Sequence, residues 1–243
     1  MRYKLYNMSM DSLHSVAVMI IRELYLRRFA HYSDLMRPTG LESDVFKFHV
    51  RKLVKLGIIE KLETGKYALT PVGKELANRF DYDKKAATRQ PKMTTITILR
   101  RKNEGTYEYL FHQRSRNPYF GYWGVLGGTV AWGESFEDAA RRGVRLRTGL
   151  ELKNLRLSGY YRQRDFDRQS GVVLEDKLFV VFVADQFSGE LAEETEMGRN
   201  CWRTIEDIAR EKKYFVACLE MIHRADGPLY FVANDSQYLS DEY

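Results

Sequence analysis

The fold of the second half of the chain is decided by residues 117–152, NPYFGYWGVLGGTVAWGESFEDAARRGVRLRTGLEL. Four runs rich in β-branched and aromatic residues lie on either side of this stretch, at 94–100, 107–113, 159–164 and 177–184. Such runs favour strands, because branched and aromatic side chains pack well on a pleated surface. The second half therefore predicts a sheet whose strands are separated by this one long segment.

The stretch resembles the Nudix hydrolase signature, G-x5-E-x7-R-E-U-x-E-E-x-G-U, in which U is a bulky apolar residue. The residues on signature positions are Gly128, Glu134, Arg142, Val144, Gly149 and Leu150. GYWGVLGG also resembles the family's G-x-W-x-x-P-G-G, with Leu126 where proline is usual, and WRTIEDIA from Trp202 fits a late family segment. The resemblance covers about residues 93–225 and implies an α/β/α sandwich with a mixed sheet, in which Gly128, Glu134 and Gly149 are structural remnants of the signature.

Three signature glutamates are missing. The resemblance places them at positions 143, 146 and 147, on one helix face, where family members use them to hold magnesium while water attacks a diphosphate. This chain has Gly143, Leu146 and Arg147 there. We therefore expect no catalytic residue, no metal and no cofactor, and a domain that binds a phosphorylated effector without cleaving it.

Arginine offers a bidentate fork to phosphate oxygens, so Arg147 is the first candidate for the effector's phosphate. The other phosphate candidates are Arg114, Arg116 and Arg142, and Tyr122 and Trp123 are candidates for stacking on a base or sugar. The alternative is that the arginines form a solvated helix face and that Trp123 belongs to the core.

The first part of the chain differs in charge. Residues 1–92 carry 18 Lys and Arg against 10 Asp and Glu, a net charge of +8, whereas residues 93–243 carry 21 against 23, a net charge of −2. The polar segment 81–92, which contains Pro91, separates the two parts. We predict a domain over 1–82, a linker over 83–92 and a second domain over 93–243. The asymmetry indicates that the first domain meets a polyanion.

Hydrophobic spacing predicts a helix over 11–29 with a buried stripe, namely Leu13, Ala17, Ile20, Ile21 and Leu24. A short helix follows from Ser33, and a capping box at Thr39 and Glu42 starts a longer helix to Leu56. The predicted inward residues of that helix are Leu41, Val45, Phe48, Leu53 and Leu56. A hairpin over 58–62 and 66–70, and then a helix over 71–80, complete the domain.

This order, with the sequence FKFHVRKLVKLGIIEKLETGKYALTPVGKEL at 46–76, closely resembles the winged helix-turn-helix of bacterial and archaeal transcription regulators. A helix about 10–12 Å across fits the roughly 12 Å major groove of DNA. Candidates for contacts to base edges are Ser43, Phe46 and Lys47, and candidates for contacts to phosphates are Arg51, Lys52, Lys61 and Lys66. The alternative is a winged helix that binds a partner protein.

Together these features predict a transcription regulator that binds double-stranded DNA and senses a phosphorylated small molecule such as a nucleotide or nucleotide sugar. Paired half-sites about one helical turn apart would require a homodimer. The longest apolar runs, 16–21 and 179–184, are too short to cross a bilayer, and no signal peptide precedes them, so we expect a cytoplasmic protein without a membrane partner. Cys201 and Cys218 are expected to be reduced thiols.

Two other hypotheses stay open. The first is a Nudix-type hydrolase of nucleoside diphosphate derivatives with an accessory winged helix domain and a relocated metal site. Its candidate carboxylates are Glu137, Asp138, Glu193, Glu194 and Glu196. The second is an adaptor whose winged helix contacts a protein.

Overall fold

The computed structural model describes residues 14–78, 80–81, 86–87, 90–239 and 242–243. The chain divides into two compact units, residues 1–89 and 90–243, and each is described by itself. None of the described helices is both long and apolar enough to span a membrane.

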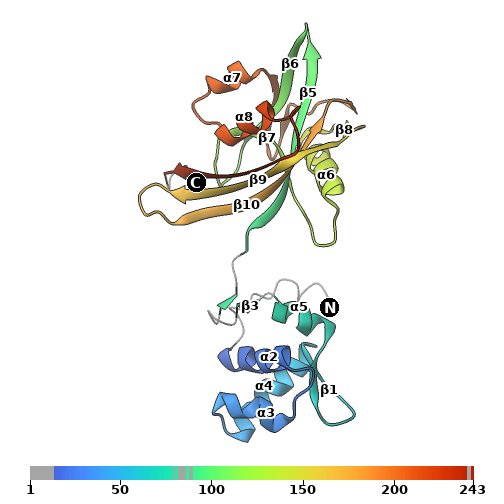
Figure 1. The fold of residues 1–243 in the computed structure, drawn as a ribbon, viewed down its shortest axis with the longest axis vertical. Helices are drawn as coiled ribbons and strands as arrows, with labels where there is room; N and C mark the ends of the chain where they lie inside the picture. The colour runs from blue at the N-terminus through green and yellow to red at the C-terminus, as the bar shows by residue number, and fades with distance from the viewer. Residues whose placement is uncertain (1–13, 79, 82–85, 88–89, 240–241) are drawn as a thin grey trace. The chain divides into compact units, whose positions relative to one another are not determined.

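The described part of the first unit is built from short helices and two antiparallel pairs of short strands, β1–β2 and β3–β4 (Figure 1). Its elements are α2 (Ser15–Leu26), α3 (Tyr32–Met36), the 3-10 turn η2 (Arg37–Thr39), α4 (Ser43–Lys55), β1 (Ile59–Lys61), β2 (Tyr67–Leu69), α5 (Pro71–Asn78), β3 (Phe80–Asp81) and β4 (Ala86–Ala87). Strands β1 and β2 pair antiparallel, with Glu60 opposite Ala68. The expected order of helices and hairpin is thus found.

Helix α2 buries the expected stripe. Ala17, Ile20, Ile21 and Leu24 lie in the core with Val16, whereas Leu13 lies outside the described residues. The helix is shorter than predicted, because the imidazole of His14 caps it by accepting a hydrogen bond from the amide of Val16, and because Arg27 already has extended backbone.

Helix α4 differs from its prediction in both start and rotation. No capping box forms at Thr39, whose hydroxyl donates to the Met36 carbonyl, while Gly40 adopts a left-handed φ of 64° that ends the 3-10 turn. The helix therefore begins at Ser43, and its buried residues are Phe46, Val50 and Leu53. Val45 and Phe48 are 50% and 64% exposed. The predicted inward face was wrong in these residues.

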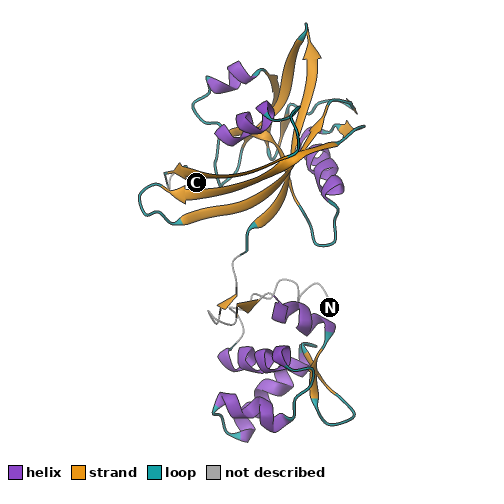
Figure 2. Ribbon diagram, in the orientation of Figure 1, coloured by secondary structure: helices purple, strands orange, loops and turns teal. Residues whose placement is uncertain are grey.

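The second unit is an α/β/α sandwich around an eight-stranded mixed sheet (Figures 1 and 2). Its main elements are β5 (Lys92–Asn103), β6 (Thr106–Arg114), β7 (Trp123–Thr129), α6 (Phe136–Thr148), β9 (Arg156–Asp167), β10 (Val173–Ala184), β12 (Glu194–Thr195), β13 (Gly198–Arg203), α7 (Ile205–Ala209), α8 (Val216–His223) and β14 (Tyr230–Tyr238). The short strands β8 (Glu151–Leu152) and β11 (Phe187–Ser188) form a separate pair.

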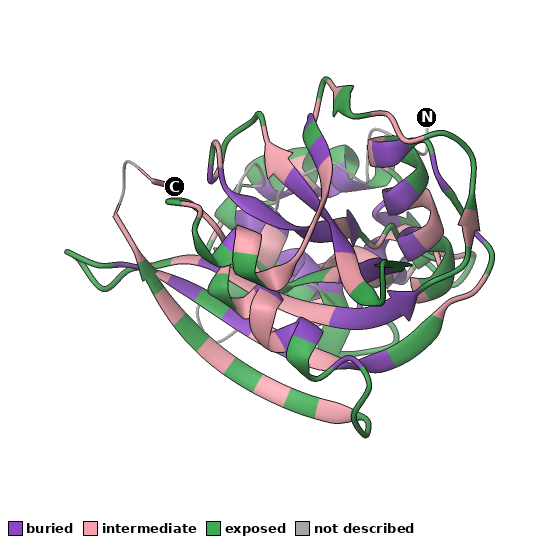
Figure 3. Cartoon of the chain, turned by 90° about the horizontal axis from the view of Figure 1, so that it is seen from above, coloured by how far each residue is buried: buried purple, intermediate pink, exposed green. Residues whose placement is uncertain are grey.

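The sheet order is β12-β13-β6-β7-β5-β10-β9-β14. The pairs β5–β10 and β9–β14 are parallel and the other pairs are antiparallel. The first half of β5 pairs with β7 and its second half with β6, so that β5 joins the two parts of the sheet. At the outer edge, β14 alternates half-buried and exposed residues, as Figure 3 shows.

Alternating side chains of the central strands build two cores on opposite faces, as the two-residue period of a strand requires. Ile98, Phe111 and Val125 pack with the residues of α7 and α8. Leu99, Leu110 and Leu126, each one position away, pack with Val144 of α6. The four predicted strand runs lie in β5, β6, β9 and β10, which confirms them.

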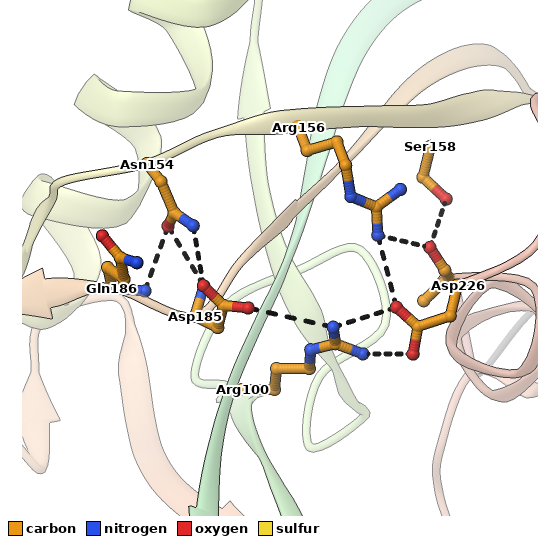
Figure 4. A network of polar contacts seen from close by, with 8 residues as sticks. Arg100, Asn154, Arg156, Ser158, Asp185, Gln186 and Asp226 are labelled. Atoms are coloured by element: carbon orange, nitrogen blue, oxygen red, sulfur yellow. Dashed lines mark hydrogen bonds and ion pairs between the residues drawn. The ribbon is translucent and has the colours of Figure 1, made fainter.

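A cluster of charged groups fastens the turn after α8 to the sheet (Figure 4). The buried Arg100 of β5 donates two hydrogen bonds to Asp226, at 2.6 and 2.9 Å. Arg156 of β9 donates to the Ala225 carbonyl at 2.7 Å. The bidentate pair with Asp226 holds the pKa of its carboxyl below its usual value.

Candidate functional sites

The loop between β7 and α6 is held by two residues on signature positions, Glu134 and Arg142. The guanidinium of Arg142 donates to both carboxylate oxygens of Glu134, at 2.6 and 2.8 Å, and to the Thr129 carbonyl at 2.8 Å. Glu134 also accepts from the amide of Ala131. These bonds, the one from Arg142 first, lower the pKa of Glu134 to about 2. Because Arg142 is committed to the loop and lies outside the cavity, its assignment to effector binding is corrected to a structural role.

Helix α6 lies in glycine-to-glycine contact with β7. A Cβ atom on Gly143 would approach the Gly127 carbonyl oxygen and the Gly128 Cα to 3.0 Å each. A Cβ atom on Gly128 would lie 2.7 Å from the Ala139 carbonyl oxygen. Gly149, with a φ of 73°, then ends the helix. Gly128 and Gly149 thus occupy positions at which packing or backbone conformation favours glycine.

A cavity of about 260 Å³ lies between this helix, the sheet and α8. Its cationic lining residues are Lys92, Arg114, Arg116, Arg147 and Lys177. Its carboxylates are Asp165 and Glu175, and His112 and Gln163 are further polar groups. The apolar lining residues include Ile96, Phe179, Phe215, Met221 and Cys218, with Tyr119 and Tyr238 as aromatic alcohols. Such a cavity can hold a ligand with one anionic end and one apolar end.

Three arginines make one end of the cavity strongly cationic. The side chain of Arg147 donates to the Gly143 carbonyl at 3.1 Å, and the Nε of Arg114 donates to the Pro118 carbonyl at 2.9 Å. Burial, followed by the charges of Arg116 and Arg114, lowers the pKa of Arg147 to about 10. Among the residues that the structure describes, neither Arg114, Arg116 nor Arg147 forms an ion pair. A bound anion would relieve this repulsion.

The two carboxylates of the cavity are already engaged. Asp165 accepts from the hydroxyl of Tyr119 at 2.6 Å and from the amide of Gln163 at 2.8 Å, and burial raises the pKa of Asp165. Glu175 accepts from Lys92 at 3.0 Å and lies 3.7 Å from Lys177. Burial acts to raise the pKa of Glu175, but Lys177 and Lys92 lower it overall. Asp165 and Glu175 lie opposite each other on the consecutive strands β9 and β10. No sequence motif singled them out.

The two predicted stacking residues are placed elsewhere. Trp123 is 3% exposed and packs in the core of the second unit, under the guanidinium of Arg203. Tyr122 is buried and donates to the Glu242 carboxylate at 3.0 Å. Neither lines the cavity, so their assignment to effector stacking is corrected. Tyr119, in the same quoted stretch, lines it instead.

The carboxylates considered for a relocated metal site do not line the cavity either. Glu137 and Asp138 are exposed in the first turn of α6, where Asp138 accepts from the hydroxyl of Ser135. Glu193, Glu194 and Glu196 are exposed around β12. Within the described part of the chain, no group of three or more His, Cys, Asp or Glu side chains is arranged to hold a metal ion.

The candidate nucleic-acid contacts gather on α4 and the hairpin of the first unit. Ser43, Lys47, Arg51 and Lys52 are exposed on α4, Lys61 is exposed on β1, and Lys66 is half-buried just before β2. Phe46 is fully buried beside Tyr32, so it cannot reach a base edge, and that assignment is wrong. The apolar residues that α4 exposes are Val45, Phe48 and Val54.

Comparison with known proteins gives one family match. Residues 90–219, more than half of the chain, match the family described as NUDIX domain. A curated relative, the "Uncharacterized Nudix hydrolase YvcI" of Bacillus subtilis, is 30% identical over 95 residues, which are 38% of this chain and 58% of that protein. The "ADP-ribose pyrophosphatase" of Methanocaldococcus jannaschii is 30% identical over 118 residues, which are 49% of this chain and 64% of that protein.

A solved structure of a MutT protein from Bacillus halodurans is 21% identical, with a TM-score of 0.50, and covers 63% of this chain and 93% of that chain. At this identity the likeness supports the fold alone. The chain spans less than two thirds of the two curated relatives, so their activities are not transferred with the match.

Proposed function

The chain belongs to the Nudix family, and from this premise we propose that it is a DNA-binding transcription regulator whose Nudix domain binds a phosphorylated small molecule without hydrolysing it. The observation that supports this proposal best is the position of Arg147. This residue takes the place of a signature glutamate and faces the cavity with Arg114 and Arg116. A magnesium site needs hard anionic oxygen ligands, whereas three clustered guanidinium groups attract the phosphate oxygens directly.

The first unit supplies the DNA-binding part of the proposal. Helices α2, α3 and α4 followed by the β1–β2 hairpin have the element order of a winged helix, in which α4 is the recognition helix and the hairpin is the wing. Residues 1–89 carry 17 Lys and Arg against 10 Asp and Glu, a net charge of +7, and several of these cations are exposed on α4 and β1. Lys47 lies near the start of α4 for contacts with bases, and Val45 and Phe48 offer apolar contacts to thymine methyl groups.

The regulatory step is a thermodynamic linkage. A phosphorylated ligand that prefers one arrangement of the two units changes the affinity for DNA by the same factor by which DNA changes the affinity for the ligand. Two recognition helices about one helical turn apart would read paired half-sites, so the proposal includes a homodimer.

A thermal-shift screen of the full chain tests the proposal. The panel contains inorganic diphosphate, ADP-ribose, nucleotides and nucleotide sugars, with and without magnesium, and product is followed in the same wells. A ligand at about 100 times its Kd stabilises the native state by about 2.7 kcal/mol. Metal-independent stabilisation without product supports a sensor, and magnesium-dependent turnover contradicts it. Salt-dependent binding to duplex DNA is measured in parallel, and its absence at low ionic strength would favour the adaptor.

A hydrolase is the second candidate, favoured by two observations. The relatives at 30% identity carry hydrolase names, and Asp165 and Glu175 are carboxylates inside the cavity. Both carboxylates already have partners in Tyr119, Gln163, Lys92 and Lys177, so a metal would have to displace these bonds. Turnover that is lost in Glu175→Gln and unchanged in Glu194→Gln would select this candidate.

A further inference from the structure

A buried asparagine, Asn200, contacts the cavity-lining His112, and its hydrogen-bond partners determine the orientation of its side-chain amide. The amide nitrogen of Asn200, on β13, donates to the carbonyl of Arg147 at 2.7 Å and to the carbonyl of Ala192 at 2.6 Å. Carbonyl oxygens only accept hydrogen bonds, so the NH₂ group of Asn200 must point to them. Its amide oxygen is thereby fixed toward the imidazole of His112, at 2.9 Å from Nδ1.

The imidazole of His112 consequently faces an oxygen at each end. Its Nε2 lies 3.1 Å from the Met197 carbonyl oxygen, and both partners are acceptors. A neutral imidazole has one N–H and can satisfy only one of them, whereas the imidazolium donates to both. The ring packs closely over Gly198, because a Cβ atom at that position would lie 2.8 Å from His112 Cε1.

The two acceptors around this ring favour its protonated form, whereas the nearby positive charges disfavour it. Arg147 of α6 and Arg114 of the ring's own strand β6 are the charged groups that act on it. Strand β7 places Gly124 opposite His112, and β13 contributes the neutral Asn200. His112 lines the same cavity as the two arginines. An anion held by them would therefore neutralise the charge that repels the proton.

We propose that His112 takes up a proton when an anionic ligand binds at Arg114 and Arg147, so that the affinity of the cavity for its ligand rises as the pH falls. This inference rests on the proposed function, since it deepens the proposed anion site. His112 acts as a positioning residue, because the protonated ring holds Asn200, and Asn200 holds the carbonyl of Arg147 at the end of α6.

The direction of the effect follows from linkage. In the free protein burial, and then the two arginines, lower the pKa of His112 below its ordinary value. The bound anion raises this pKa. Between the free and bound values, binding is coupled to the uptake of up to one proton, and the ligand's Kd then rises by up to about tenfold per pH unit as the pH is raised.

Sulfate is the probe, because it is a tetrahedral dianion that does not itself titrate over the range of about pH 5 to 8 in which histidine does. Its binding to the full chain is measured by calorimetry across that range, in buffers of different ionisation enthalpy. We expect a Kd that increases with pH and an uptake of up to about one proton on binding, as linkage requires. His112→Gln should bind sulfate without the pH dependence. His223→Gln, at an exposed histidine of α8, is the matched control and should keep it.

A second measurement uses the unmodified chain, so that the test does not depend on whether the His112 variant folds. Nitrogen-15 spectra of the five histidine rings distinguish an imidazole with one N–H from an imidazolium with two. We expect sulfate to convert His112 to the second form at constant pH. Sulfate binding that needs Arg147 but shows neither pH dependence nor proton uptake would overturn this inference and leave the anion site standing. Absence of sulfate binding would overturn the anion site itself.

Discussion

The three positions that lack signature glutamates have three different environments. Gly143 is buried against β7, Leu146 is 57% exposed, and Arg147 lines the cavity. Only the last of these substitutions changes what the cavity can bind, because only this side chain reaches it. The arginines of this helix therefore have different roles although they are close in sequence. Arg142 holds the loop before α6, Arg145 lies on the surface, and Arg147 lines the cavity.

Replacing Arg147 should weaken phosphate binding selectively. Hydrogen bonds to charged groups contribute about 1.5–3 kcal/mol, so Arg147→Gln should raise the Kd for inorganic diphosphate by about 10- to 100-fold. The measurement is calorimetry on the full chain without magnesium. Arg145→Gln is the matched control, because Arg145 lies on the same helix and only approaches Glu151, at 3.8 Å. Equal losses in both variants would show that general positive charge, not the cavity, binds diphosphate.

At the scale of elements, helix α6 depends on its close contact with β7. Gly143→Glu restores a signature glutamate but places a Cβ 3.0 Å from the Gly127 oxygen, so overpacking should cost about 1–3 kcal/mol, offset in part by about 1 kcal/mol of helix propensity. Leu146→Glu restores another at an exposed position and should change stability by less than about 0.5 kcal/mol. Thermal unfolding followed by tryptophan fluorescence measures this, because Trp123, Trp132 and Trp202 all belong to the second unit. Equal stability of the two variants would contradict the packing argument.

The buried face of helix α4 could not be predicted from its own sequence. Its existence and cations were predictable, but two apolar stripes compete: Val45 with Phe48, and Phe46 with Val50 and Leu53. The choice depends on tertiary packing against Ile20 and Leu24 of α2, which no local pattern contains. In the second unit the strands and the structural role of Glu134 were predictable from local sequence, whereas the role of Arg142 as its partner was not. The cavity was not predictable, because the parallel pairing of β10 with β5 and the packing of α6 and α8 bring together groups from distant segments.

The helix and the hairpin of the first unit should contribute differently to DNA binding. Lys47→Ala, on α4, should relax the sequence preference recovered by selection from a random duplex pool, because its position suits a base contact. Lys66→Ala, at the hairpin, should weaken binding to every duplex and reduce the salt slope by about one. Preferences and slopes are compared with those of the unmodified chain. If neither variant alters binding, α4 and the hairpin do not dock as proposed.

At the scale of the whole molecule, regulation requires that ligand binding to the second unit change the affinity of the first unit for DNA. Coupling free energies in regulated proteins are typically about 1–3 kcal/mol, so a saturating ligand should change DNA affinity by about 5- to 150-fold. The test is a thermodynamic cycle. The Kd for DNA is measured with and without the ligand of the panel that stabilises the chain most, and the Kd for that ligand is measured with and without DNA. Dimerisation is followed by sedimentation. Arg147→Gln should leave DNA affinity in the absence of ligand unchanged but reduce the effect of the ligand at a fixed, subsaturating concentration. Because the excess positive charge of residues 1–89 and the arginine cavity lie in separate units, a factor of one in both arms would mean two independent binding modules rather than a regulator.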